Sequence, residues 1–152
     1  KYDNLIICRS FSKIGLAGCR IGVIITNSKL RNLLYKFRPF YEISSFSALV
    51  LEIILKNKKI FEDYIDETLK GKKIVEQYLK NKKIRYFSSK TNFMLLNLQN
   101  SVLTKKLFKS LRKNSFLVNM IDISKYKNLI KFTLGPEFIM RKFIKVINKT
   151  VK

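Results

Sequence analysis

The segment Arg9–Gly22 reads RSFSKIGLAGCRIG and contains two serines, one lysine and three glycines. Two short and almost continuously apolar runs flank it, Leu5–Cys8 before it and Ile21–Ile25 after it. Runs of this length that are rich in β-branched residues are typical of strands buried on both faces. The pattern therefore predicts a loop between two core strands, a place where functional residues are often found.

The residue types in this loop favour the binding of an anion beside a reactive lysine. Glycines let backbone N–H groups approach a ligand closely, and the serine hydroxyls and the Arg20 guanidinium would add further donors. A lysine held next to a bound anion can attack an aldehyde to form a Schiff base. Phosphate, aldehyde and lysine together are what pyridoxal phosphate requires of its protein.

The motif Ser-Phe-Ser-Lys followed by Gly-Leu-Ala-Gly-Cys-Arg-Ile-Gly resembles the cofactor-lysine segment of fold-type-I pyridoxal-phosphate-dependent aminotransferases. Within that family it is most similar to the histidinol-phosphate aminotransferase branch. Later segments resemble that branch in the same order, namely residues 36–41, 43–45, 89–93 and 132–137. The resemblance implies an α/β fold, the C-terminal part of a fold-type-I transferase that contains the end of the large-domain sheet and the small α/β domain.

The resemblance also implies roles for four residues of the loop. Lys13 would be the catalytic residue, which carries the cofactor as a Schiff base and moves the α-proton of the substrate. Arg20 would clamp the cofactor phosphate through a bidentate contact. Ser10 and Ser12 would line the same phosphate site. An ordinary turn would also use two such serines for local hydrogen bonds, so this alternative stays open.

Two positions near the end of the chain differ from the family pattern. Lys131 and Asn119 stand where the resembled branch carries arginines that hold the anionic group of the substrate. A lysine binds an anion as a point charge and lacks the bidentate fork of arginine. We therefore expect an amino substrate whose anion is smaller or differently placed than that of histidinol phosphate. An exposed lysine at a strand end is the alternative for Lys131.

The implied domain organisation places residues 1–55 in a remnant of the large, cofactor-binding domain. Residues 56–152 would form the small α/β domain, including the long inter-domain helix. The residues that pair with the pyridine nitrogen and stack on the ring would precede this stretch, so the chain alone is expected to be inactive. The resemblance implies a cytoplasmic homodimer that transfers an amino group from a small-molecule donor to a 2-oxo acid acceptor.

Two other functions are compatible with the sequence. A decarboxylase of the threonine-phosphate type shares the lysine segment, and carbon dioxide as a product would distinguish it from an aminotransferase. The net charge of +22 and the pI near 10.2 would also suit a basic module that binds polyanions. However, the basic residues are evenly spread and form no cluster with exposed aromatics, so we expect no specific binding of nucleic acid.

The remaining composition argues against metal and membrane binding. The sequence has no histidine and no Cys-x-x-Cys motif, so no metal site is predicted, and Cys8 and Cys19 are expected to be free, buried thiols in a reducing compartment. No apolar run approaches the roughly 20 residues that a membrane helix needs, so no membrane association is expected.

The apolar periodicity predicts the remaining elements. Gly71 interrupts the longest predicted helix at a cost of roughly 1 kcal/mol, and the apolar stripe of that helix is expected to pack into the core. Helices are predicted over residues 28–37, 44–55 and 58–81, from Ser101, and after Pro136; strands are predicted over residues 84–87, 93–98, 116–118 and 129–134.

Overall fold

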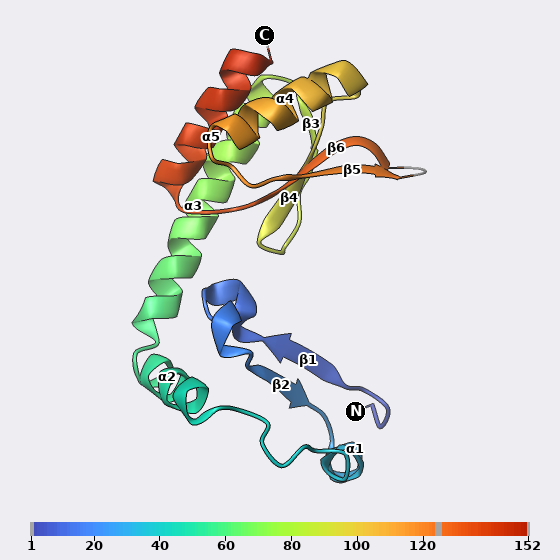
Figure 1. The fold of residues 1–152 in the computed structure, drawn as a ribbon, viewed down its shortest axis with the longest axis vertical. Coiled ribbons are helices and arrows are strands. Elements are labelled where there is room, and N and C mark those ends of the chain that lie inside the picture. The colour runs from blue at the N-terminus through green and yellow to red at the C-terminus, as the bar shows by residue number, and fades with distance from the viewer. Residues whose placement is uncertain (1, 124–125, 152) are drawn as a thin grey trace. The chain divides into compact units, whose positions relative to one another are not determined.

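The computed structural model describes residues 2–123 and 126–151 (Figure 1). The chain divides into two compact units, Lys1–Asp63 and Tyr64–Lys152. The boundary falls within the long helix α3 (Lys59–Asn81). The assignment of residues 1–55 and 56–152 to the large and small domains of the family stays a prediction.

The first unit is built on a hairpin of two strands, β1 (Ile7–Ser10) and β2 (Gly22–Ile25). They pair antiparallel, with Ile7 opposite Ile25 and Ser10 opposite Gly22. Two short 3-10 turns, η1 (Phe11–Ile14) and η2 (Ala17–Cys19), connect them. The loop between two strands is therefore present as predicted from the sequence.

Two helices follow the hairpin, and a polar side chain caps the start of each. The side chain of Asn27 accepts a hydrogen bond from the Leu30 amide at 2.9 Å at the start of α1 (Ser28–Tyr35). The Ser44 hydroxyl accepts one from the Ser47 amide at 3.1 Å at the start of α2 (Ser45–Lys56). These bonds satisfy amide groups that have no partner inside the helix.

The prediction that β1 and β2 are core strands is wrong for this unit. Every residue of both strands is exposed, and Ile24 and Ile25 keep 57% and 56% of their surface. Among the described residues of the unit, Ile21 and Ser47 are the buried ones. The apolar composition correctly indicated strands, but burial on both faces requires further layers, which these residues do not supply.

The second unit is a four-stranded antiparallel sheet in the order β3-β4-β6-β5, with helices on one side (Figure 1). Burial alternates along β4, as expected when one face of a sheet is covered. The strands are β3 (Arg85–Phe87), β4 (Phe93–Asn97), β5 (Asn119–Ile123) and β6 (Tyr126–Thr133); α4 (Ser101–Lys113) and α5 (Glu137–Thr150) complete the unit. The core combines side chains from α3, β4, α4, β6 and α5, including Val75, Leu79, Met94, Leu96, Leu107, Leu111, Ile130, Phe132, Phe143 and Ile147.

The structure differs from the sequence-based expectations at two places in this unit. The strand expected over residues 116–118 begins only at Asn119, because those three residues form the extended approach to β5. The apolar stripe of α3 is buried only in its C-terminal half. Val75 and Leu79 are fully buried, whereas Ile60 and Leu69 are 56% and 55% exposed. Periodicity identifies the apolar face of a helix but not the length over which a neighbour covers it.

Candidate functional site

The loop between β1 and β2 is closed by tight backbone pairing. Ser10 and Gly22 form the last residue pair of the two strands. One more backbone hydrogen bond follows, from the Phe11 amide to the Ile21 carbonyl at 3.2 Å. A Cβ atom on Gly22 would lie 3.1 Å from the carbonyl oxygen of Arg9 on the paired strand. The glycine therefore fits this close approach of two backbones, and the base of the loop is held firmly.

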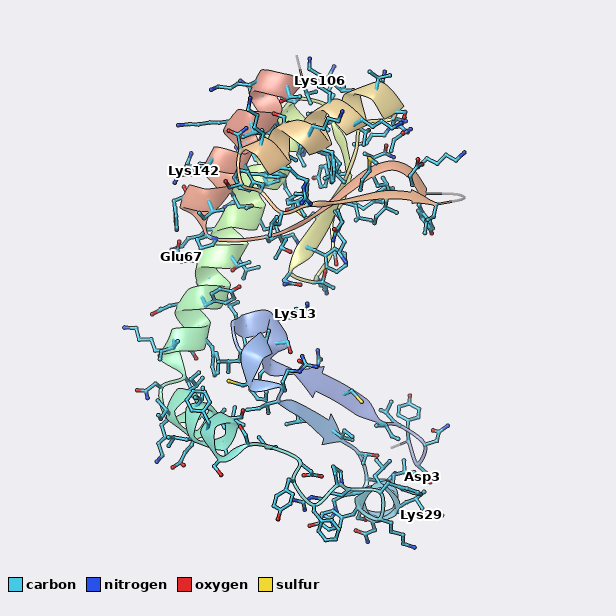
Figure 2. The ribbon with its side chains drawn as sticks, in the orientation of Figure 1. Asp3, Lys13, Lys29, Glu67, Lys106 and Lys142 are labelled. Atoms are coloured by element: carbon cyan, nitrogen blue, oxygen red, sulfur yellow. The ribbon has the colours of Figure 1, made fainter. Side chains whose placement is uncertain are left out.

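The two predicted phosphate-binding serines lie side by side at the start of η1. The Ser10 hydroxyl accepts a hydrogen bond from the Ser12 amide at 3.0 Å and donates one to the Ser12 hydroxyl at 2.8 Å. The Ser12 oxygen is thus an acceptor in this pair, and its own proton remains available to another acceptor. Lys13 comes next on the same turn with an exposed side chain (Figure 2). The lysine and the two serines therefore belong to one short turn of the backbone.

The ends of both 3-10 turns adopt the left-handed backbone conformation. Gly15 ends η1 with φ of 96°, and a Cβ atom there would meet nothing within 4 Å. The backbone conformation, and not the space around it, is what requires glycine at this position. Arg20 ends η2 with φ of 53°, which costs a residue other than glycine roughly 1–2 kcal/mol. The neighbouring Ile21 is 2% exposed and anchors this end of the loop.

The donor set of the loop fits a group that carries both a phosphate and an aldehyde. Between Asp3 and Glu42 the sequence contains no acidic residue. The hydroxyls of Ser10 and Ser12, the Arg20 guanidinium and the Lys13 amine therefore have no competing carboxylate in the same segment. Hydroxyl and guanidinium groups bind phosphate oxygens, and a primary amine reacts with an aldehyde.

The two predicted substrate-binding residues are neighbours in the second unit. Asn119 on β5 lies directly opposite Lys131 on β6 in the antiparallel register. The Lys131 amine lies 4.1 Å from the centroid of the Phe93 ring, which belongs to β4. Lys131 is the sixth of the eight residues of β6 and is half-buried, so its side chain is not the fully exposed one of the alternative interpretation. The structure thus places Asn119 beside Lys131 in the second unit and Ser10 beside Ser12 in the first.

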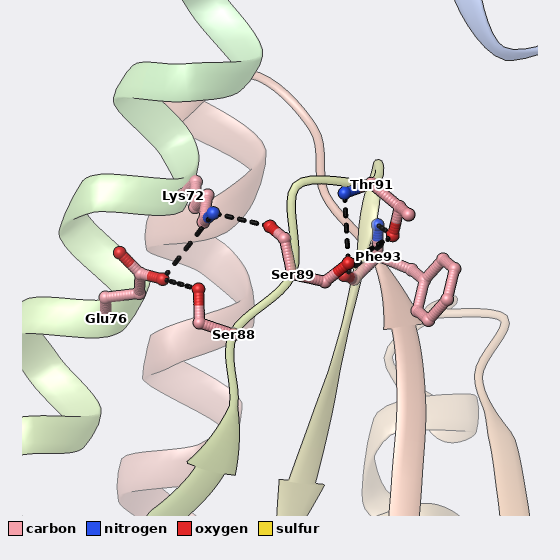
Figure 3. A network of polar contacts seen from close by, with 6 residues as sticks. All are labelled: Lys72, Glu76, Ser88, Ser89, Thr91 and Phe93. Atoms are coloured by element: carbon pink, nitrogen blue, oxygen red, sulfur yellow. Dashed lines mark hydrogen bonds and ion pairs between the residues drawn. The ribbon is translucent and has the colours of Figure 1, made fainter.

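A polar network that sequence reasoning missed fixes the loop between β3 and β4 to α3 (Figure 3). The Lys72 amine donates to the Ser89 carbonyl at 2.6 Å and lies 3.8 Å from the Glu76 carboxylate. The same carboxylate accepts from the Ser88 hydroxyl at 2.5 Å, and the Ser89 hydroxyl accepts from the Thr91 amide at 3.0 Å. The spacing of four residues between the lysine and the glutamate was the available signal.

The described residues hold no group of three or more histidine, cysteine, aspartate or glutamate side chains that could bind a metal. Cys8 and Cys19 are both free; Cys8 is exposed, which corrects the expectation that both thiols are buried. Within residues 2–123 and 126–151, no helix has the length and apolar character needed to span a membrane.

The family described as "Aminotransferase class I and II" matches residues 1–147. This chain belongs to that family. A histidinol-phosphate aminotransferase from Clostridium novyi is 34% identical over 150 residues, which are 97% of this chain and 40% of that protein. The chain thus spans about 40% of the length of the curated relative. The predicted family is confirmed.

Solved structures confirm the α/β fold. A histidinol-phosphate aminotransferase from Clostridium acetobutylicum matches with a TM-score of 0.79 and 24% identity, over 97% of this chain and 46% of that one. The enzyme of the same name from Sinorhizobium meliloti, in complex with pyridoxal-5'-phosphate, matches with a TM-score of 0.66 and 19% identity, over 97% of this chain and 42% of that one. An L-threonine-O-3-phosphate decarboxylase from Porphyromonas gingivalis matches with a TM-score of 0.73 and 20% identity, over 97% of this chain and 46% of that one.

Proposed function

We propose that this chain is the C-terminal part of a pyridoxal-phosphate-dependent aminotransferase similar to histidinol-phosphate aminotransferases. The observation that carries the proposal is the arrangement of Ser10, Ser12 and Lys13 on one 3-10 turn, in a chain of this family. The chain covers about 40% of its relative's length, so we assign the activity to a protein that includes the remaining part. We expect the 152 residues alone to be inactive.

The loop residues divide the work of holding the cofactor. The Ser12 hydroxyl, which keeps a free proton, and the Arg20 guanidinium bind the phosphate, while Ser10 orients Ser12 through their hydrogen bond. Lys13 would hold the cofactor through its amine and, once freed by the substrate, would take the α-proton from the substrate and return it. When bound, pyridoxal phosphate supplies an aldehyde for the amino group and a ring that accepts the electrons of the broken C–H bond.

Lys131 and Asn119 are proposed to contact the anionic group of the amino donor. The position of Lys131 over the Phe93 ring restrains the amine, and Asn119 adds an amide beside it. One lysine and one amide offer fewer charge-assisted bonds than two arginines, which favours a donor with a smaller or differently placed anion than histidinol phosphate. The acceptor is a 2-oxo acid, and we propose a cytoplasmic homodimer as the active form.

The test uses the full-length protein with added pyridoxal phosphate. We expect a visible absorption band, and after reduction with borohydride the label should map to the peptide that contains Lys13. Lys13→Ala should abolish both signals, and Lys36→Ala, which removes an exposed lysine of the same unit, should leave them intact. A missing band, or label spread over many lysines, would overturn the cofactor assignment.

A decarboxylase is the second candidate, because a threonine-phosphate decarboxylase shares the fold. Product analysis with a panel of amino donors separates the two reactions. A 2-oxo acid formed together with a new amino acid supports amino transfer. Release of carbon dioxide from the donor supports decarboxylation, and rapid turnover of histidinol phosphate would refute the expected change of substrate.

A further inference from the structure

The second unit contains a pocket of about 320 Å³ between helices α4 and α5. Its lining comes from the end of α4, from Phe116 beyond it and from one face of α5. Three lysines line its α5 side, namely Lys142, Lys145 and Lys149. Their spacing of three and four residues places them on one face of the helix. Figure 2 labels the first of them, Lys142. The pocket shares no residue with the β1–β2 loop.

These three lysines carry charge that no carboxylate of the described chain neutralises. None of them takes part in an ion pair within residues 2–123 and 126–151. The only acidic residue of α5 is Glu137, which binds Arg141 at 2.5 Å. From Gln77 to the end of the sequence, Asp122 is the only other acidic residue. Three like charges around one pocket repel one another, and a bound anion would relieve that repulsion.

The pocket has an apolar floor and a polar wall, and contacts within the unit hold both in place. Val146 is buried, and the half-buried Phe116 ring packs edge-on against Phe143 with centroids 5.4 Å apart. The Ser110 hydroxyl accepts a hydrogen bond from the Thr150 hydroxyl at 3.1 Å, which links α4 to α5. The pocket therefore combines an apolar floor with a lining that includes three lysines.

We propose that this α4–α5 pocket binds a nucleoside di- or triphosphate. The phosphates lie among the amines of Lys142, Lys145 and Lys149, and the ring lies on the apolar floor at Phe116. A volume of about 320 Å³ falls at the lower end of the range of small-molecule sites, which favours a nucleotide partly open to solvent over a macromolecule. Several phosphate charges match several amines, whereas a neutral ligand would leave them unpaired.

Calorimetric titration of the protein with ATP, adenosine and tripolyphosphate tests this proposal. We expect ATP to bind more tightly than either part alone, and its affinity to fall as salt rises. The triple variant Lys142→Ala, Lys145→Ala, Lys149→Ala should weaken ATP binding by about tenfold or more. All three sites are on a helix where alanine is the most favourable residue, so the variant should fold.

The matched control removes the same charge from the outer side of α4, through Lys105→Ala, Lys106→Ala and Lys109→Ala. These lysines are exposed and do not line the pocket. The control should change ATP affinity by less than about threefold, a small free-energy difference. Photo-crosslinking with 8-azido-ATP, followed by peptide mapping, should label the peptides of α5 or of the segment around Phe116.

Four results would overturn the proposal. If the two triple variants weaken ATP binding equally, general charge attraction explains the binding and the pocket does not. Tripolyphosphate that binds as tightly as ATP would remove the role of the apolar floor. Absence of ATP binding, or tighter binding of duplex DNA that both variants weaken equally, would leave the surface as a non-specific polyanion contact.

Discussion

A Cβ atom on Gly71 would lie 2.1 Å from the carbonyl oxygen of Gly135. Gly71 is in the middle of α3, and Gly135 belongs to the turn between β6 and α5. Such a distance is far inside van der Waals contact, so only a residue without a side chain allows the two backbones to meet. The sequence suggests a helix weakened by glycine, but the structure shows that the glycine allows the helix to pack against this turn.

Gly71→Ala should therefore destabilise the protein although alanine is the better helix former. Overpacking of this kind costs about 1–3 kcal/mol. Because the clash is with a backbone oxygen at 2.1 Å, we expect a cost in the upper part of that range, above the gain of roughly 1 kcal/mol in helix propensity. We expect a lower midpoint in urea unfolding. Gly18→Ala is the control, because its Cβ would meet nothing within 4 Å. Equal stability of both variants would show that the turn moves aside without cost.

The second prediction concerns the left-handed residue that ends η1. Gly15→Ala should strain the loop by about 1 kcal/mol or more, because φ of 96° is unfavourable for alanine. The strain acts on the turn that carries Lys13, so the affinity of the full-length protein for pyridoxal phosphate should fall several-fold. Absorbance titration measures this affinity.

Gly18→Ala also serves as the control for the loop, since it lies in the same segment without a left-handed backbone. It should leave cofactor affinity within about twofold of the unchanged protein, as expected for exposed substitutions without a special role. An unchanged affinity in Gly15→Ala would show that the conformation of η1 does not control the position of Lys13.

Local features of this chain were largely predictable from sequence, because they depend on neighbours along the chain. The cap at Ser44 and the hydrogen bond between the serines flanking Phe11 both depend on contacts within four residues. The cross-strand pair of Asn119 and Lys131 was not predictable as a pair. It depends on the register between β5 and β6, and β5 is an exposed edge strand without apolar alternation.

Burial was predicted less well than secondary structure for the same reason. The runs around Ile7 and Ile24 have the composition of core strands, yet both are exposed in the first unit. Apolar composition shows that a strand is suited to burial. Whether the strand is buried depends on whether other helices or strands cover its faces. Exposed apolar strands of this kind are expected if the chain is the C-terminal part of a longer enzyme, as we propose, whose remaining part would cover them.

The third prediction compares two lysine–glutamate pairs of α3. Glu76→Gln should destabilise the protein by about 1 kcal/mol, because the Glu76 carboxylate accepts from Ser88 and lies near the partly buried Lys72. Glu67→Gln removes a shorter pair of 2.8 Å with Lys70, but both side chains are more exposed. It should leave the urea midpoint unchanged. A larger loss in Glu67→Gln would contradict the importance of the network in Figure 3.

The last prediction tests Lys131 as a contact of the substrate anion. Lys131→Met keeps most of the side-chain length but removes the amine above Phe93. In the full-length protein we expect kcat/KM for anionic amino donors to fall by about tenfold or more, since a charged partner is lost. Lys131→Arg restores a bidentate donor and should raise turnover of histidinol phosphate relative to the unchanged protein.

Lys127→Met is the matched control, because Lys127 lies four residues earlier on the same strand and is exposed. It removes an equal charge and should leave kcat/KM within about twofold, because a distant exposed charge is screened by salt. Similar losses in Lys131→Met and Lys127→Met would reduce the effect to net charge. A loss confined to Lys131→Met, together with improved histidinol phosphate turnover in Lys131→Arg, would show that this strand position selects the anionic group of the donor.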